Sequence, residues 1–143
     1  MVEFKEFARR FGKLQAFVVK EGQKILKANE KMIVDMQTSQ HHAGVNRDSN
    51  QMQGGYSTGY GKRRKKKGLQ TSFVDLHFSG KYHKSLKVVP AKGGVDVKSN
   101  VDYEQYLRKN FPGEAGLTSP NAEAVAEIVA NKLAVEIKKF LVA

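Results

Sequence analysis

A run of six adjacent basic residues near the middle of the chain limits how the rest can fold. Residues 62–67 have the sequence KRRKKK, and glycines flank the run on both sides. Six like charges in a row repel one another, and burying an unpaired charge costs far more free energy than a small core returns. We therefore expect an exposed loop or frayed segment at this point.

The run also concentrates the charge of the protein. The 143 residues include 25 Lys plus Arg against 14 Asp plus Glu, for a formal net charge of +11. Residues 41–87 hold 10 basic and 2 acidic side chains, whereas residues 88–143 hold 7 of each. Charge placed in this way favours contact with a polyanion or an acidic protein surface through one segment.

Length and composition narrow the class of protein further. A chain of 143 residues with 40% hydrophobic and 27% charged residues has the make-up of one soluble globular domain. The lack of cysteine excludes disulfides and thiolate metal sites. No stretch approaches the roughly 20 apolar residues of a membrane span, so we expect no membrane contact and a cytoplasmic origin.

The first part of the domain, residues 1–40, has apolar residues at helical spacing. The pattern from Phe4 to Met36 predicts one long amphipathic helix, with a bend near Glu21 and Gly22. Its first half presents more apolar area than the end of a small domain can easily hide, which favours contact with a neighbouring subunit. The residues predicted for this subunit interface are Phe4, Phe7, Phe11 and Leu14.

The second part, residues 41–70, lacks periodicity and is rich in glycine and small polar residues. We predict a long loop that continues into the basic run. Loops of this length inside a domain are usually functional or disordered until bound.

The third part, residues 71–143, predicts an α+β core. The alternating residues of Thr71–Gly80 indicate a strand or extended segment, and residues 81–98 a β-hairpin with its turn at Pro90–Gly94. A helix is expected after Asp102 as N-cap, and a final helix after Ser119 as N-cap. An apolar stripe of the final helix is predicted to pack on the hairpin: Val125, Ile128, Val129, Leu133, Ile137, Phe140 and Leu141.

Residues that carry catalysis or bind cofactors are sparse in this sequence. The four histidines, His41, His42, His77 and His83, have no clustered thiols or carboxylates beside them to complete a zinc site. The glycines before the run lack the Lys-Ser or Lys-Thr pair that a phosphate-binding loop requires. We therefore predict a protein that is not an enzyme, with no metal, no cofactor and no small-molecule substrate.

The basic run itself allows three interpretations. It could neutralise phosphates of DNA without sequence specificity, dock onto an acidic neighbour in an assembly, or remain a solvated loop. The residues predicted to bind DNA or a partner protein are Lys62, Arg63, Arg64, Lys65, Lys66 and Lys67.

The order of these segments resembles the tail-completion or head–tail joining (neck) proteins of tailed bacteriophages, in particular those of Bacteroides phages. The resemblance covers most of the chain and follows the segments HAGVNRDSNQMQGGYS, VDLHFSGKYHKSL, SNVDYEQYLRKNF and GLTSPNAEAV. Family positions before the first long strand are matched by Ser79, Gly80, Lys81, Tyr82 and Ser85, and those after the hairpin by Ser99, Tyr103, Tyr106 and Leu107.

This resemblance implies a structural protein of the virion. Such a protein assembles in the host cytoplasm and joins a homo-oligomeric ring that connects the connector or adaptor to the tail terminator or tail tube around the DNA. The alternative that the sequence leaves open is a small basic module that binds nucleic acid nonspecifically.

Overall fold

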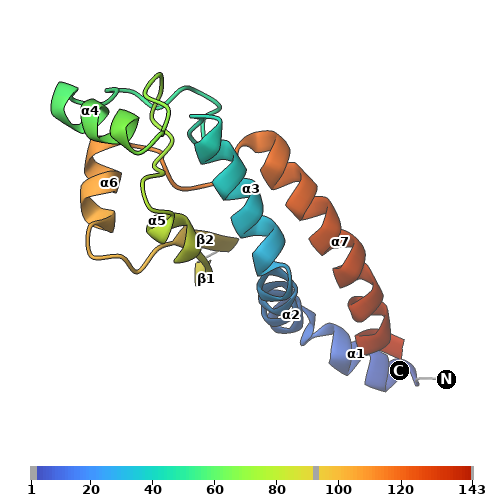
Figure 1. Cartoon of the computed structure of the whole chain (residues 1–143). Coiled ribbons are helices and arrows are strands. Elements are labelled where there is room, and N and C mark those ends of the chain that lie inside the picture. The colour runs from blue at the N-terminus through green and yellow to red at the C-terminus, as the bar shows by residue number, and fades with distance from the viewer. Residues whose placement is uncertain (1–2, 92–93, 143) are drawn as a thin grey trace.

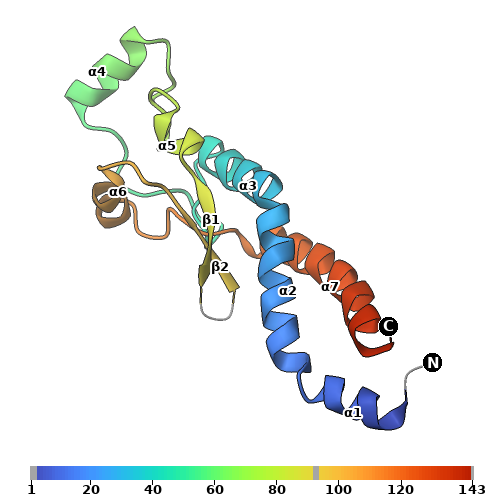
Figure 2. The same ribbon diagram turned by 90° about the horizontal axis from the view of Figure 1, so that it is seen from below.

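The computed structural model describes residues 3–91 and 94–142 and has a mixed α+β fold that is mostly helical. The molecule is elongated, with both termini at one end and α4 at the other (Figure 1 and Figure 2). In chain order the elements are α1 (Phe4–Phe11), α2 (Leu14–Ala28), α3 (Glu30–His42), α4 (Thr58–Lys66), α5 (Lys81–Lys84), β1 (Lys87–Ala91), β2 (Gly94–Lys98), α6 (Glu104–Asn110) and α7 (Ser119–Val142).

The predicted hairpin is confirmed. β1 and β2 pair antiparallel, with Lys87 opposite Lys98 and Val88 opposite Val97. The predicted turn is shorter than expected because Pro90 already belongs to β1, and its residues 92–93 lie outside the described part of the chain.

The core lies where α3, the hairpin and the start of α7 meet. Alternate residues of each strand face inward, so Val88 and Val97 are almost completely buried, and Ile33 of α3 covers them. The buried residues of this core are Ile33, Tyr82, Leu86, Val88, Val97, Val101 and Val125.

The N-terminal region forms three helices, so the prediction of one long helix is wrong. The chain breaks at Gly12 and Lys13, and again at Asn29, where the side-chain Nδ2 donates to the Ile25 carbonyl over 2.7 Å. The Ile25 carbonyl thus accepts from both the backbone amide and the side chain of Asn29, and a side-chain hydrogen bond of this kind competes with continuation of the helix. Gly22, where a bend was predicted, lies inside the continuous α2.

The C-terminal helix α7 does not pack along the hairpin as predicted. Its 24 residues span about 36 Å, whereas five-residue strands span about 17 Å, so most of the helix extends past the sheet. It lies instead along α2 and α1, and the Phe17 and Phe140 rings stack 4.2 Å apart. Among its described residues Val125 alone is fully buried, and the other six of the predicted stripe are half-buried.

Residues 71–80 form no strand ladder with any described residue. Leu76 has a positive φ of 57°, which a β-strand does not tolerate. Asp75 and Val74, which are adjacent and would face opposite sides of a strand, are both buried. The segment is therefore extended but irregular, and side chains satisfy its backbone groups.

Two predicted N-caps are also wrong. The residue that caps α6 is Tyr103 rather than Asp102, and it makes no side-chain capping bond. Ser119 is already helical, since α7 begins there.

Gly22→Ala tests the continuity of α2. No described atom lies within 4 Å of the added Cβ, and alanine favours a helix interior over glycine by about 1 kcal/mol. We expect the free energy of unfolding in urea to rise by about 0.5–1 kcal/mol. Gly44→Ala should instead destabilise, because φ is +73° and the new Cβ would lie 2.6 Å from Phe73 Cδ2. A loss with Gly22→Ala would mean that the chain bends there.

Candidate functional site

The basic run is helical rather than a loop. Ser57 caps α4, since its Oγ accepts from the Tyr60 amide over 3.3 Å, and the helix continues to Lys66. A helix turns 100° per residue, so it directs the six consecutive cations in different directions. Five of them, Lys62, Arg63, Lys65, Lys66 and Lys67, are exposed, whereas Arg64 is fully buried.

Arg64 is held by the irregular segment that follows α4. Its Nη2 lies 3.0 and 3.2 Å from the two carboxylate oxygens of Asp75. Its Nε donates to the Gln70 carbonyl over 3.0 Å, and its Nη1 donates to the His77 carbonyl. The guanidinium also lies 4.2 Å from the centre of the Tyr56 ring, within cation–π range.

Asp75 is equally well satisfied. Burial alone would raise the pKa of its carboxyl group, but hydrogen bonds from Gln70, the His77 amide and Tyr56, together with the Arg64 charge, hold that pKa below its ordinary value. The ion pair is therefore charged at neutral pH. Arg64, predicted to bind DNA or a partner, is unavailable for either because it stabilises the fold.

The five exposed cations of residues 62–67 fall into two groups. Arg63 and Lys67 lie over the Phe78 ring, 5.6 and 4.3 Å from its centre, on the side that faces the rest of the molecule. Lys62, Lys65 and Lys66 make no hydrogen bond, ion pair or ring contact with any residue that the structure describes. We call these three the basic face.

A cleft of about 640 Å³ lies on the inner side of α4, between that helix, residues 76–82 and α6. Aromatic side chains line much of it: Tyr56, Tyr60, Phe78, Tyr82, Tyr103, Tyr106 and Phe111. Because Tyr60 and Arg64 face this cleft, the basic face lies on the other side of the helix.

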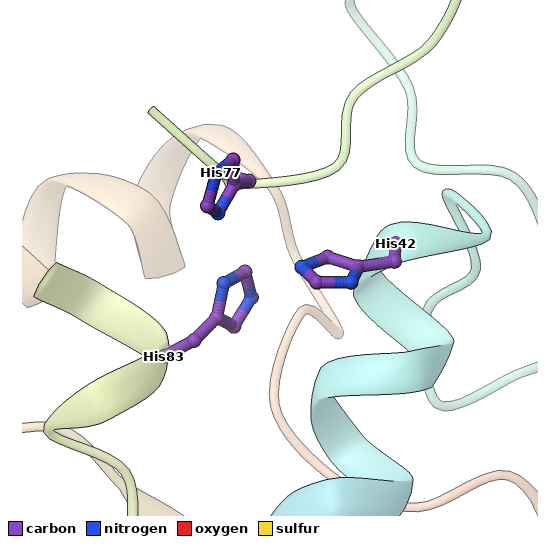
Figure 3. A group of neighbouring side chains, drawn as sticks. All are labelled: His42, His77 and His83. Carbon is purple, nitrogen blue, oxygen red and sulfur yellow. The ribbon is translucent and has the colours of Figure 1, made fainter. Parts of the chain in front are cut away.

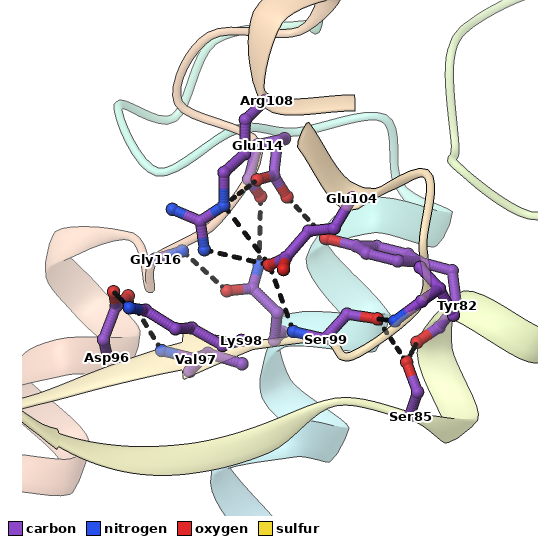
Figure 4. A network of polar contacts seen from close by, with 12 residues as sticks. Tyr82, Ser85, Asp96, Val97, Lys98, Ser99, Glu104, Arg108, Glu114 and Gly116 are labelled. Atoms are coloured by element: carbon purple, nitrogen blue, oxygen red, sulfur yellow. Dashed lines mark hydrogen bonds and ion pairs between the residues drawn. The ribbon is translucent and has the colours of Figure 1, made fainter. Parts of the chain in front are cut away.

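A polar network shares Tyr82 with this cleft (Figure 4). Tyr82 Oη donates to Glu114 Oε2 over 2.5 Å, and Arg108 lies 3.7 Å from the same carboxyl group. Burial raises the pKa of Glu114, although the Tyr82 hydrogen bond and the Arg108 charge oppose that shift. The Gly116 amide donates to Gln37 Oε1 over 2.7 Å, which fixes residues 114–116 against α3.

Three of the four histidines meet beside this network (Figure 3). One ring nitrogen each of His42, His77 and His83 lies within 4.8 Å of the others, and we call these three residues the histidine cluster. They come from the end of α3, from the irregular segment and from α5. Sequence reasoning missed this cluster because 34 residues separate His42 from His77 and no local pattern links them.

His41 lies behind the histidine cluster and contacts it directly. Its Nδ1 is 3.0 Å from His83 Nε2, and its Nε2 is 2.5 Å from the Glu114 carbonyl oxygen. Burial lowers the pKa of His41 to about 4, and burial together with the neighbouring histidines lowers that of His83 to about 3. Both rings are therefore neutral at pH 7.

The predicted subunit-interface residues lie at the opposite end of the molecule. Phe4 is 86% exposed and Phe11 58% exposed, while Phe7 and Leu14 are half-buried. The Phe7 and Phe11 rings stack with their centres 6.4 Å apart. We call Phe4 and Phe11 the phenylalanine face.

Comparison with protein-family models, curated proteins and solved structures found no match to this chain. Among the described residues, no helix combines the length and apolar character needed to cross a membrane.

Arg64→Met and Lys65→Met differ by one position and should differ greatly in effect. Arg64→Met leaves the Asp75 carboxylate buried without its partner, which typically costs about 3–5 kcal/mol. Lys65→Met removes an exposed side chain and should change the free energy of unfolding by less than about 0.5 kcal/mol. Urea denaturation followed by circular dichroism measures both, and equal effects would contradict the assignment of Arg64.

Proposed function

We propose that this chain is a non-enzymatic structural subunit of the head–tail interface of a tailed bacteriophage. In this proposal it is a tail-completion or neck protein that forms a homo-oligomeric ring and joins the connector to the tail. The order of its sequence segments, which resembles the tail-completion and head–tail joining proteins, supports this assignment.

The strongest structural support for the proposal is the presence of two candidate contact surfaces at opposite ends of the molecule. Helices α4 and α1 lie at opposite ends of the elongated molecule (Figure 1). The basic face belongs to α4 and the phenylalanine face to α1. A subunit that joins two layers of an assembly needs separate contact surfaces of this kind.

The phenylalanine face supports contact between subunits. Burying an exposed phenylalanine side chain is worth about 1.5–3 kcal/mol. Phe4 and Phe11 lie about two turns apart on the same side of α1. Arg10 Nη1 donates to the Phe140 carbonyl over 3.3 Å, so α1 is also attached to α7 through a polar contact. Because α1 is held in place in this way while Phe4 and Phe11 stay exposed, a neighbouring subunit can contact these two rings.

The basic face supports contact with a polyanion. Its three ammonium groups have no partner among the described residues, so no existing contact has to break when they meet phosphates or carboxylates. Packaged DNA in the channel and an acidic patch of an adjacent ring protein both meet this requirement.

A small nucleic-acid-binding module remains the alternative, and the aromatic cleft favours it. Tyrosine and phenylalanine rings in a cleft can stack on bases of a single strand. The basic face, however, points away from the cleft, whereas a stacking site usually tracks the backbone with cations along the same groove. This arrangement favours contact with phosphates or carboxylates outside the cleft.

Neutralising the basic face tests whether it contacts phosphates. The triple variant Lys62→Gln, Lys65→Gln and Lys66→Gln should reduce the slope of log affinity for duplex DNA against log salt by up to about 2.7, because each phosphate contact contributes about 0.9. Fluorescence anisotropy between 50 and 200 mM salt measures the slope.

The control for this experiment has the same change in net charge. Lys13→Gln, Lys20→Gln and Lys138→Gln remove three exposed cations of the other end and should leave the slope nearly unchanged. Equal slopes in all three proteins would exclude a phosphate contact by the basic face and leave an acidic protein as its partner.

Removing the phenylalanine face tests assembly. Phe4→Ser with Phe11→Ser should shift the protein from oligomer to monomer in sedimentation velocity at micromolar concentration, because both side chains lose their buried area in the ring. Val19→Ser with Val135→Ser removes two other exposed apolar side chains, 56% and 54% exposed, and should leave the oligomer intact. A wild-type chain that stays monomeric up to millimolar concentration would contradict the ring proposal.

A further inference from the structure

The histidine cluster contains two buried nitrogens whose hydrogen-bonding capacity is unused. Nδ1 of His77 and Nδ1 of His83 have no hydrogen-bond partner among the described residues. Leaving a buried polar atom unsatisfied is costly, and such atoms in a native fold mark a missing ligand, ion or water. Both belong to residues that converge on the same space (Figure 3).

The contacts behind the cluster determine which nitrogen of His83 is available. A carbonyl oxygen only accepts, so the 2.5 Å contact with Glu114 requires the proton of neutral His41 to lie on Nε2. Its Nδ1 is then an acceptor and takes the hydrogen bond from His83 Nε2–H over 3.0 Å. The lone pair of His83 is therefore on Nδ1, the unsatisfied atom.

The Gln37 amide and the Glu114 carbonyl compete for the same nitrogen of His41, and the shorter carbonyl contact decides where the proton lies. Its Nε2 lies 3.1 Å from His41 Nε2, which would fit a hydrogen bond to an unprotonated ring nitrogen. That arrangement would bring two acceptors, the ring nitrogen and the Glu114 carbonyl, to 2.5 Å, where they repel. The Gln37 amide instead faces the same carbonyl at 3.5 Å, while its Oε1 accepts from the Gly116 amide.

We propose that His42, His77 and His83 bind a divalent transition-metal ion of the Zn²⁺ type. Imidazole nitrogens suit zinc and its neighbours, whereas Mg²⁺ and Ca²⁺ require oxygen ligands. A histidine ligand whose other nitrogen donates to a second group is the usual arrangement around such ions, and His41 is that group for His83. His41 is therefore a positioning residue.

The spacing of the nitrogens is close to what an ion requires. A tetrahedral zinc ion with bonds of 2.0–2.1 Å holds its ligands about 3.4 Å apart. The nitrogens lie within 4.8 Å of one another, so their separations need to shorten by up to about 1.4 Å, which side-chain rotations supply. His42 is exposed, so an ion reaches the site from solvent.

Three protein ligands leave one coordination position for water or an external group. The bound ion would link the end of α3, the irregular segment and α5, three parts that no strand ladder joins. This inference does not depend on the proposed function, since it rests on the cluster alone.

Calorimetric titration of the untagged, chelator-treated full chain with Zn²⁺ tests the proposal. We expect one ion per chain, a rise in melting temperature on loading, and no binding of Mg²⁺. His42→Ala should weaken Zn²⁺ binding at least tenfold, and His77→Gln should do the same, with circular dichroism verifying that both fold. Ser39→Ala, one turn earlier on the exposed part of α3, is the matched control and should bind as the wild type does.

Nitrogen-15 NMR of the histidine rings provides a readout that a purely structural role would not change. Zn²⁺ should shift Nδ1 of His77 and His83 while His83 Nε2 stays protonated. The proposal is overturned if wild-type chain binds no Zn²⁺ at micromolar concentration, if both histidine variants bind as tightly as Ser39→Ala, or if His83 coordinates through Nε2.

Discussion

The buried ion pair between Arg64 and Asp75 holds the irregular segment that follows α4 against that helix. Residues 70–77 have no strand partner among the described residues, so their backbone groups need other hydrogen bonds. Arg64 donates to the carbonyls of Gln70 and His77, and Asp75 accepts from the His77 amide. Two charged side chains thus satisfy backbone hydrogen-bonding groups of this segment, as interstrand hydrogen bonds do in β1 and β2.

The same ion pair influences both the basic face and the histidine cluster. By directing Arg64 inward, it turns Lys62, Lys65 and Lys66 toward solvent on the far side of α4. By holding both backbone groups of His77, it places that ring beside His83. A change at the ion pair would therefore disturb both the basic face and the histidine cluster, although they share no residue.

Local sequence patterns predicted elements whose residue spacing lies within a single segment. Alternating valines predicted the hairpin, and apolar spacing predicted α6 and α7. The predictions that failed depended on partners distant in sequence. Burial of Asp75 depends on Arg64, which lies 11 residues earlier in the chain. The position of α7 depends on α2 and α1, along which most of the helix lies because it is longer than the strands.

The sequence by itself determined an α+β chain with a neutral C-terminal part, a hairpin and a central concentration of positive charge. Only the tertiary structure decided that one of six adjacent cations is buried and that three histidines meet. The physical reason is that burial of a charge depends on its partner, and convergence of ligands depends on the path of the chain. Neither property is encoded in the spacing of residues along a single segment.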